Sequence, residues 1–299
     1  MYEGGEADIV SVTVKTDIHV VSAATEICVL SADDGAPVRG VTSLGDELYV
    51  IHCRQTDQID VYSKSDFAFL RRFSVPGLSQ HGIEDMTSCP LLDCLLIADS
   101  ERRCLHKINR DHKNTTAIWR LSHKPHGLSE VSCWDDAVVL VACLAEAPLP
   151  QFNIGKVLEL NAAGKCVREC VLQRGIESLW HAAELGFCNY VICYKGCWCA
   201  RGEKIGKVRS DGEVQHCYGD WWIPGDRQLL RGACHMAVDD FGFVFVADTE
   251  NSRLVLLNPS LEFVRSIATK TRPRRLHLEK TSRRLFVGHD YNAVSIIQL

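Results

Sequence analysis

Short apolar runs recur along the chain, and a turn-forming or polar stretch closes each of them. Examples are residues 48–51, 59–62, 94–98, 243–247 and 285–288. They are rich in valine, isoleucine, leucine and aromatic residues, which are favoured in strands. No window combines the apolar spacing of about three to four residues with the end caps that would predict an amphipathic helix. The pattern therefore predicts an all-β protein.

The runs group into six similar copies, each with a small residue or histidine ahead of its first strand. The copies start at Gly40, Gly82, Gly127, His181, His235 and Arg275, which are 42, 45, 54, 54 and 40 residues apart. Four-stranded propeller blades repeat at about 40–50 residues. We therefore predict a single six-bladed β-propeller of four-stranded antiparallel blades over residues 1–299. The predicted blades are approximately 38–75, 81–121, 126–172, 178–218, 232–268 and 272–299.

The sixth copy has only three strands, so we expect a strand from residues 8–30 to complete it. The candidate runs are 9–14, 18–21 and 27–30, and the pattern does not choose among them. Such a strand would pair the two ends of the chain and leave no open sheet edge at the closure.

The fifth copy resembles the NHL repeat. Its residues 235–239 read His-Met-Ala-Val-Asp, a turn glycine follows at Gly242, and Asp248 precedes Asn251 and Arg253. The resemblance implies that Asp248 caps a turn that Asn251 and Arg253 hold by hydrogen bonds. The second copy keeps Ile-Ala-Asp at 97–99, and the third keeps Pro-His-Gly-Leu at 125–128. The chain thus resembles the propellers of tripartite-motif NHL proteins and of uncharacterised invertebrate relatives, which implies a binding scaffold rather than an enzyme.

Composition and charge narrow the setting of the protein. The net charge is −5 and 46% of the residues are hydrophobic, so the chain as a whole has no global attraction for nucleic acid or anionic membranes. We see neither a membrane span nor a secretory signal and expect a cytoplasmic monomer. Fifteen cysteines in such a chain are expected to be reduced, and Cys94, Cys143 and Cys193 lie in apolar runs.

Four histidines mark blade starts: His81, His126, His181 and His235. They are expected near the central channel, and similar histidines bind zinc in the propeller of peptidylglycine amidating lyase, which this chain resembles in fold. His181 and His235 share one register, whereas His81 and His126 precede the glycine position. We therefore expect channel-rim histidines rather than a catalytic zinc centre.

Three acidic residues are predicted to share another register: Asp85, Glu130 and Glu184, each three residues after the small position. Converging carboxylates hold Ca²⁺ in lactonase-type propellers, but the asparagines that those enzymes also use are not at matching positions here. With His81 and His126, these three are the candidate metal ligands. The expectation is that no metal or other cofactor is bound and that there are no catalytic residues.

The remaining binding candidates are basic or aromatic. Lys270, Arg272, Arg274, Arg275, Arg283 and Arg284 form a dense basic segment, which Arg39 could join to bind RNA. Trp180 stands at a blade start, and Trp221 and Trp222 lie in a long insertion where they could anchor a partner.

These features support three functional hypotheses. The first is a non-catalytic scaffold that recognises a protein or peptide through one propeller face. The second is an RNA-binding NHL module that uses residues 272–284. The third is a metal-dependent lyase or hydrolase at the channel. The binding-face candidates are Arg39, His81, His126, Trp180, His181, Trp221, Trp222, His235, Arg274 and Arg275.

Overall fold

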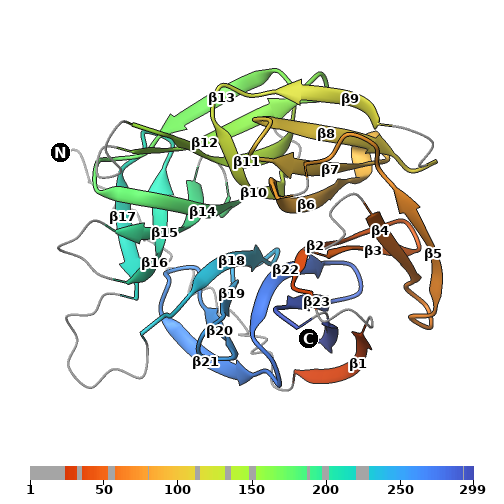
Figure 1. The fold of residues 1–299 in the computed structure, drawn as a ribbon. Coiled ribbons are helices and arrows are strands. Elements are labelled where there is room, and N and C mark those ends of the chain that lie inside the picture. The colour runs from red at the N-terminus through yellow and green to blue at the C-terminus, as the bar shows by residue number, and fades with distance from the viewer. Residues whose placement is uncertain are drawn as a thin grey trace, which may run out of the picture.

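A computed structural model describes most of the chain. The described residues are 24–31, 36–52, 58–79, 81–111, 115–131, 136–147, 153–186, 189–196, 202–219, 229–291 and 293–299. They form six four-stranded antiparallel sheets arranged in a ring (Figure 1). The prediction of a six-bladed all-β propeller is confirmed.

The first three blades are built from consecutive strands. Blade one has β2 (Val38–Leu44), β3 (Glu47–His52), β4 (Gln58–Ser63) and β5 (Phe69–Ser74). Blade two has β6 (Ile83–Cys89), β7 (Cys94–Asp99), β8 (Cys104–Asn109) and β9 (Thr115–Arg120), with a short 3₁₀ turn, η1 (Pro90–Leu92), between its first two strands. Blade three has β10 (Lys124–Glu130), β11 (Ala137–Ala145), β12 (Ile154–Asn161) and β13 (Cys166–Val171).

The last three blades complete the ring. Blade four has β14 (Ile176–Glu184), β15 (Asn189–Gly196), β16 (Glu203–Arg209) and β17 (Val214–Tyr218). Blade five has β18 (Ala233–Val238), β19 (Val244–Asp248), β20 (Arg253–Leu257) and β21 (Phe263–Ala268). Blade six has β22 (Pro273–Glu279), β23 (Arg284–His289) and β24 (Ala293–Gln298), and its outer strand is β1 (Thr25–Ser31).

An N-terminal strand closes the ring, as the sequence predicted. β1 pairs antiparallel with β24, and the register runs from Thr25 opposite Gln298 to Ser31 opposite Ala293. The run 27–30 therefore supplies the missing strand, whereas runs 9–14 and 18–21 lie outside the described residues.

The hydrophobic core consists of six clusters, each between two neighbouring blades. The cluster at the closure packs Val38 and Leu48 of blade one against Phe286 and Ile296 of blade six. Burying each such side chain contributes about 1.5–3 kcal/mol. Because every blade lends one face to each neighbour, the ring is held together all the way around.

The turn predicted around Asp248 in blade five forms. Asp248 is fully buried, and its carboxylate accepts hydrogen bonds from the Arg231 backbone N–H (2.7 Å), the Asn251 amide (2.9 Å) and Arg253 Nε (2.6 Å). Asp99 has the same place in blade two, where it accepts the backbone N–H groups of Ser79 (3.1 Å) and Arg102 (3.0 Å). These buried aspartates fix the connections between blades.

Cysteines in the apolar runs behave as small hydrophobic residues. Cys94, Cys143 and Cys193 are free thiols with no exposed surface. Among the described residues, no helix has the length and apolar character that crossing a bilayer requires.

Candidate functional site

Each inner strand carries a β-bulge at the same place, near its start. The unpaired extra residues are Arg39, Glu84, His126, Trp180, Cys234 and Arg274. A bulge leaves one residue unpaired and redirects its side chain. We call these six residues the rim, since five of them line a cavity of about 260 Å³ at the end of the channel where the inner strands begin.

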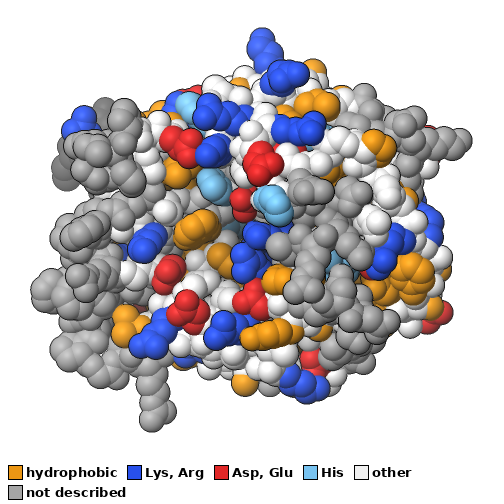
Figure 2. Space-filling view, in the orientation of Figure 1, with side chains coloured by type: hydrophobic (Ala, Val, Ile, Leu, Met, Phe, Trp, Pro, Cys, Tyr) orange, Lys and Arg blue, Asp and Glu red, His pale blue; other side chains and the backbone are white. Residues whose placement is uncertain are grey.

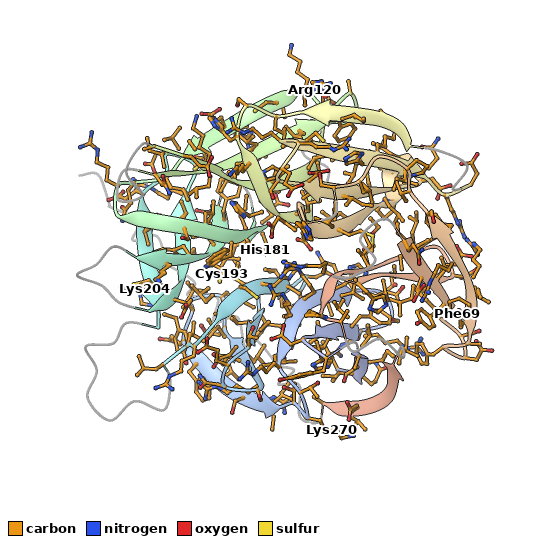
Figure 3. All side chains as sticks on the ribbon, in the orientation of Figure 1. Phe69, Arg120, His181, Cys193, Lys204 and Lys270 are labelled. Atoms are coloured by element: carbon orange, nitrogen blue, oxygen red, sulfur yellow. The ribbon has the colours of Figure 1, made fainter. Side chains whose placement is uncertain are left out.

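The next residue in each inner strand returns to the ladder, and these six equivalent positions form a second ring. They are Gly40, Asp85, Gly127, His181, His235 and Arg275. The four with polar side chains are between 1% and 6% exposed, and we call them the plug. His181 lies near the centre of the molecule, whereas Phe69, Arg120 and Lys270 lie at its perimeter (Figure 3).

This register corrects the sequence alignment in blade two. Asp85, rather than Gly82, is equivalent to Gly127 and His181, so the predicted common register of Asp85, Glu130 and Glu184 is wrong. Glu130 and Glu184 do match each other, three residues after the plug position. The prediction failed because Gly82 resembles a blade-start glycine. Its position instead requires glycine because the Asp99 and Glu101 side chains leave no room for a Cβ. A Cβ there would lie 2.8 Å from the Asp99 carboxylate.

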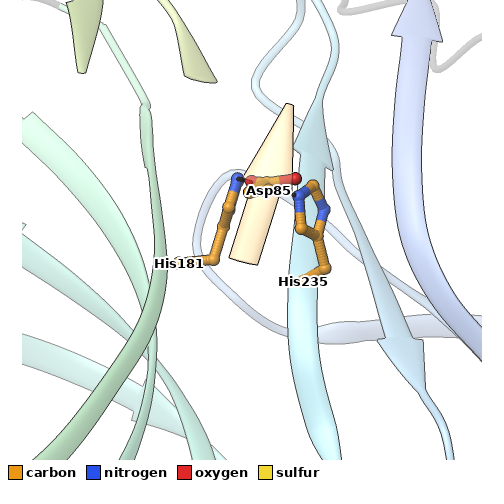
Figure 4. Close-up of side chains that lie close together, drawn as sticks. All are labelled: Asp85, His181 and His235. Atoms are coloured by element: carbon orange, nitrogen blue, oxygen red, sulfur yellow. Dashed lines mark hydrogen bonds and ion pairs between the residues drawn. The ribbon is translucent and has the colours of Figure 1, made fainter. Parts of the chain in front are cut away.

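Asp85 is the centre of the plug. It lies between His181 and His235 (Figure 4). Its Oδ2 accepts the Leu128 backbone N–H (2.8 Å) and His235 Nε2 (3.1 Å), and its Oδ1 accepts the Met86 N–H (2.9 Å). Both carboxylate oxygens are therefore satisfied by donors from blades two, three and five.

Arg275 supplies the charge that balances Asp85, with its Nε 3.6 Å from Asp85 Oδ1. The guanidinium also donates to backbone carbonyls of three rim residues, namely Arg39 (2.9 Å from Nε), Arg274 (3.1 Å from Nη1) and Glu84 (from Nη2). Bulges leave carbonyls outside the ladder, and a buried carbonyl needs a donor. A single arginine thus ties blade six to blades one and two.

The two histidines have defined proton positions. His235 Nδ1 lies 3.3 Å from the Leu276 backbone N–H, so Nδ1 accepts and the proton is on Nε2, facing Asp85. His181 Nε2 lies 3.0 Å from the Leu128 carbonyl oxygen and must donate to it. The imidazole rings pack against each other with centroids 3.8 Å apart.

Burial and charge set the protonation of the plug. Burial, followed by the neighbouring His235, lowers the pKa of His181 to about 3, so this ring is neutral at pH 7. Burial alone would raise the pKa of Asp85, but His235, Arg275 and His181 together lower it. The plug is therefore an aspartate–arginine ion pair flanked by at least one neutral histidine.

Asp85, His181 and His235 place one ligand atom each within 4.8 Å of one another, which invites a test for a metal site. A metal needs a deprotonated imidazole nitrogen, but both Nε2 atoms that face Asp85 carry protons held by backbone partners. The guanidinium of Arg275 adds a positive charge beside the carboxylate. The residues present do not fit a metal centre and instead satisfy one another.

The group Asp99, Cys104 and His106 also comes together, but it fits a metal no better. Asp99 already accepts from two backbone N–H groups and lies 3.2 Å from His106 Nε2. Burial raises the pKa of Cys104 to about 11, which disfavours the thiolate that metals bind.

A second and larger cavity, of about 460 Å³, opens at the other end of the channel, where the inner strands end. His181 and His235 form part of its lining, so the plug separates it from the rim cavity. We call it the bowl. Its wall includes Glu130 and Glu184, two of the candidate metal ligands, which lie away from Asp85 along the channel.

The structure brings several predicted binding residues together. Arg39, His126, Trp180 and Arg274 stand at the rim, and His181, His235 and Arg275 are in the plug. His81 is exposed and precedes β6, while Trp221 and Trp222 lie outside the described residues. Charged and histidine side chains gather at the centre of one face of the ring (Figure 2).

The basic segment does not form one patch. Arg275 is buried, Arg274 pairs with Asp290 (2.9 Å), and Lys270 pairs with Glu26 (2.8 Å). Arg284 donates to the Lys64 carbonyl (3.1 Å) and lies over the Phe67 ring.

Sequence reasoning placed Asp85 and Arg275 near the channel but not in one cluster with the histidines. The sequence aligned His181, His235 and Arg275 as equivalent blade starts, and only the bulge register shows that Asp85 takes the same position in blade two. It also missed the bowl, whose residues lie at the far ends of the inner strands. The available signal was the hydrophilic ends of these strands, such as Glu130 and Glu184.

Comparisons with known proteins find the fold but no family. No family model matches the chain, and no curated protein matches it. Solved structures with a similar fold include hydrazine synthase from Kuenenia stuttgartiensis (TM-score 0.62, 12% identity, 88% of this chain and 83% of that one). The WD40 β-propeller domain of Doa1 is also similar (0.60, 11%, 92% and 97%), as is a protein of unknown function from Bacteroides caccae (0.59, 14%, 81% and 82%). At these identities the similarity shows that the chain is a β-propeller and nothing finer.

Proposed function

We propose that this propeller is a non-catalytic scaffold that binds a protein or peptide partner at the rim. The observation that carries the proposal is the ring of six bulges, which sets side chains of five different types around one mouth of the channel, including two arginines. Propellers commonly present such faces to partners, and the diversity of the rim suits recognition of a varied surface.

Trp180 is the proposed anchor. Its side chain remains 37% exposed and meets the His126 ring edge-on, with centroids 6.1 Å apart. Tryptophan and arginine are enriched among the residues that dominate binding energy at interfaces. Trp180, His126 and Arg274 line the same cavity, so an aromatic and a basic contact would act on one ligand.

Catalysis is not part of the proposal, because the buried polar groups of the plug are used on one another. Asp85 and Arg275 neutralise each other, and both histidines donate to protein acceptors. A general base or metal ligand at this point would first have to break these contacts.

The finer identity that we propose is an NHL-like propeller acting as a cytoplasmic monomer. Its support is the Asp248–Asn251–Arg253 turn of blade five and the free, buried thiols of Cys94 and Cys143. RNA is the competing ligand, but no single surface of described residues gathers the basic segment.

The test is selection of peptides on the intact chain from a displayed library, followed by affinity measurements with Trp180→Ala and Arg274→Ala. We expect each variant to lose at least about tenfold in affinity. Phe263→Ala is the matched control, since Phe263 is a 40% exposed aromatic residue on the outer strand β21. This variant should bind normally.

Selected peptides that bind all three variants equally would refute the proposal. Binding of single-stranded RNA that weakens steeply with salt, with no peptide selected, would replace it with the RNA-binding function. Stoichiometric metal in the purified protein would instead revive the enzyme hypothesis.

A further inference from the structure

The bowl is a cavity at the opposite end of the channel from the rim, and it has the size of a small-molecule site. Its volume of about 460 Å³ lies within the usual range for ligand pockets, about 300–1,000 Å³. The plug histidines close its floor, and its wall comes from the ends of inner strands and the turns that follow them.

Negative charge dominates the bowl. Among the described residues that line it, four carry carboxylates, namely Glu130, Glu184, Asp239 and Asp240, and Lys280 carries the one ammonium. Three of the four already have partners within the protein, and Glu184 is one of them. Asp239 accepts the backbone N–H groups of Phe241 (2.9 Å) and Phe243 (2.8 Å), and Asp240 pairs with Lys280 (2.9 Å).

Glu130 is the carboxylate without such a role. It makes no hydrogen bond or ion pair with any residue that the structure describes. Although water reaches its side chain, the surrounding protein raises the pKa of Glu130, with Lys280 opposing this weakly. A cation in the bowl would relieve that desolvation cost.

A second, independent feature lies in the floor. His181 is 1% exposed, lines the bowl, and has a buried Nδ1 atom with no hydrogen-bond partner among the described residues. Because its proton is on Nε2, Nδ1 is an acceptor, and its lone pair receives no hydrogen bond from the described residues. A buried acceptor of this kind calls for a donor, and its neutral ring poses no repulsion to a cation.

Apolar side chains complete the wall. Val131, Leu185, Val238 and Leu278 line the bowl, and Phe241 stands at its edge with 73% of its surface exposed. Such a wall suits the aliphatic stem that carries the charge in lysine, arginine and related amines.

We infer that the bowl binds an organic cation, a guanidinium or primary ammonium on an aliphatic stem, with Glu130 as its counter-ion. The floor acceptor takes one of the ligand's N–H groups, and the apolar wall holds the stem. A bare metal ion would leave the apolar wall and most of the volume unused. This inference is independent of partner binding at the rim, because the plug separates the two cavities.

Calorimetric titration of the intact chain with N-acetyl-arginine methylamide tests the inference. The matched ligand control is N-acetyl-citrulline methylamide, which keeps the shape and removes the charge. We expect the arginine compound to bind at least about tenfold more tightly, and Glu130→Gln to remove most of that difference. Glu101→Gln, at an exposed glutamate outside the bowl, should leave binding unchanged.

A nitrogen-15 spectrum of the histidines gives a second readout. Ligand binding should move the His181 Nδ1 resonance toward that of a hydrogen-bonded acceptor, while His81, which is exposed and does not line the bowl, stays unchanged. Equal binding of both compounds, no binding of either, or indifference to Glu130→Gln would each overturn the inference.

Further ligands separate two sources of the cation. Agmatine represents a free small amine, and a peptide with a central arginine represents a protein partner. Tighter binding of the peptide than of the blocked amino acid would assign the bowl to protein side chains, and tighter binding of agmatine would assign it to small amines. Peptides that bind here should remain insensitive to Trp180→Ala, which keeps this result distinct from the rim proposal.

Discussion

In four of the six inner strands a rim residue directly precedes a plug residue, yet the two positions differ in exposure and in the contacts that they make. Arg274 is a rim residue whose side chain is partly exposed and pairs with Asp290, whereas Arg275 is 5% exposed and donates to carbonyls of three blades. One step along the backbone separates a position that solvent reaches from one that holds the ring together.

The difference teaches how a propeller can vary one ring of residues without endangering the other. The bulge residue is outside the ladder, so its side chain can change with little effect on strand pairing. The next residue faces the channel at its narrowest point. Gly127 shows this limit, since a Cβ there would lie 2.5 Å from the Trp180 carbonyl oxygen.

The largest effect is expected from Asp85→Asn. In either orientation of the new amide, its NH₂ group faces a backbone N–H, that of Leu128 or that of Met86, and Arg275 loses its buried counter-ion. Breaking a buried pair in this way costs about 3–5 kcal/mol of unfolding free energy. Urea denaturation at pH 7 measures the loss.

The control for Asp85→Asn is the adjacent rim variant Glu84→Gln. Glu84 lies 3.8 Å from Arg39 and its side chain is 25% exposed, so we expect a loss below about 1 kcal/mol. Similar losses in the two variants would remove the distinction between rim and plug.

A smaller effect is expected from Arg275→Lys, compared with Arg274→Lys one residue away. Lysine keeps the charge but lacks the planar fork, so it cannot reach the carbonyls of Arg39 and Glu84 together. The unsatisfied carbonyls should cost about 2–3 kcal/mol. Arg274→Lys should stay within about 1 kcal/mol, and the same denaturation measurement would expose a reversed order.

The fold could be predicted from the sequence because it depends on repeated local patterns. Apolar runs and turns recur in six copies, and the Asp248 turn is formed by residues within a short segment. The closing strand could be expected but not chosen, since its pairing with β24 depends on a partner more than 260 residues away in sequence.

The plug could not be predicted with the same success. His181 and His235 were correctly aligned because each directly precedes a small or apolar inner-strand run. Asp85 was misaligned because an aspartate at a blade-start position is stable only with Arg275 and two backbone donors around it. Those partners come from other blades, so no local pattern shows them.

The smallest effect distinguishes the two histidines His181 and His81 by their response to pH. The folded protein holds the pKa of His181 near 3, against about 6.5 in the unfolded chain. Between these values the unfolded chain binds a proton that the folded chain does not. Stability contributed by the neutral ring is therefore complete above about pH 6.5 and is lost as the pH falls, by at most about 1.4 kcal/mol per pH unit.

His181→Gln, whose amide can still donate to the Leu128 carbonyl, should flatten the dependence of unfolding free energy on pH from 7 to 5, measured by urea denaturation. His81→Gln, at an exposed site, should leave that slope as it is, and equal slopes in all three proteins would mean that His181 is not held neutral by the plug.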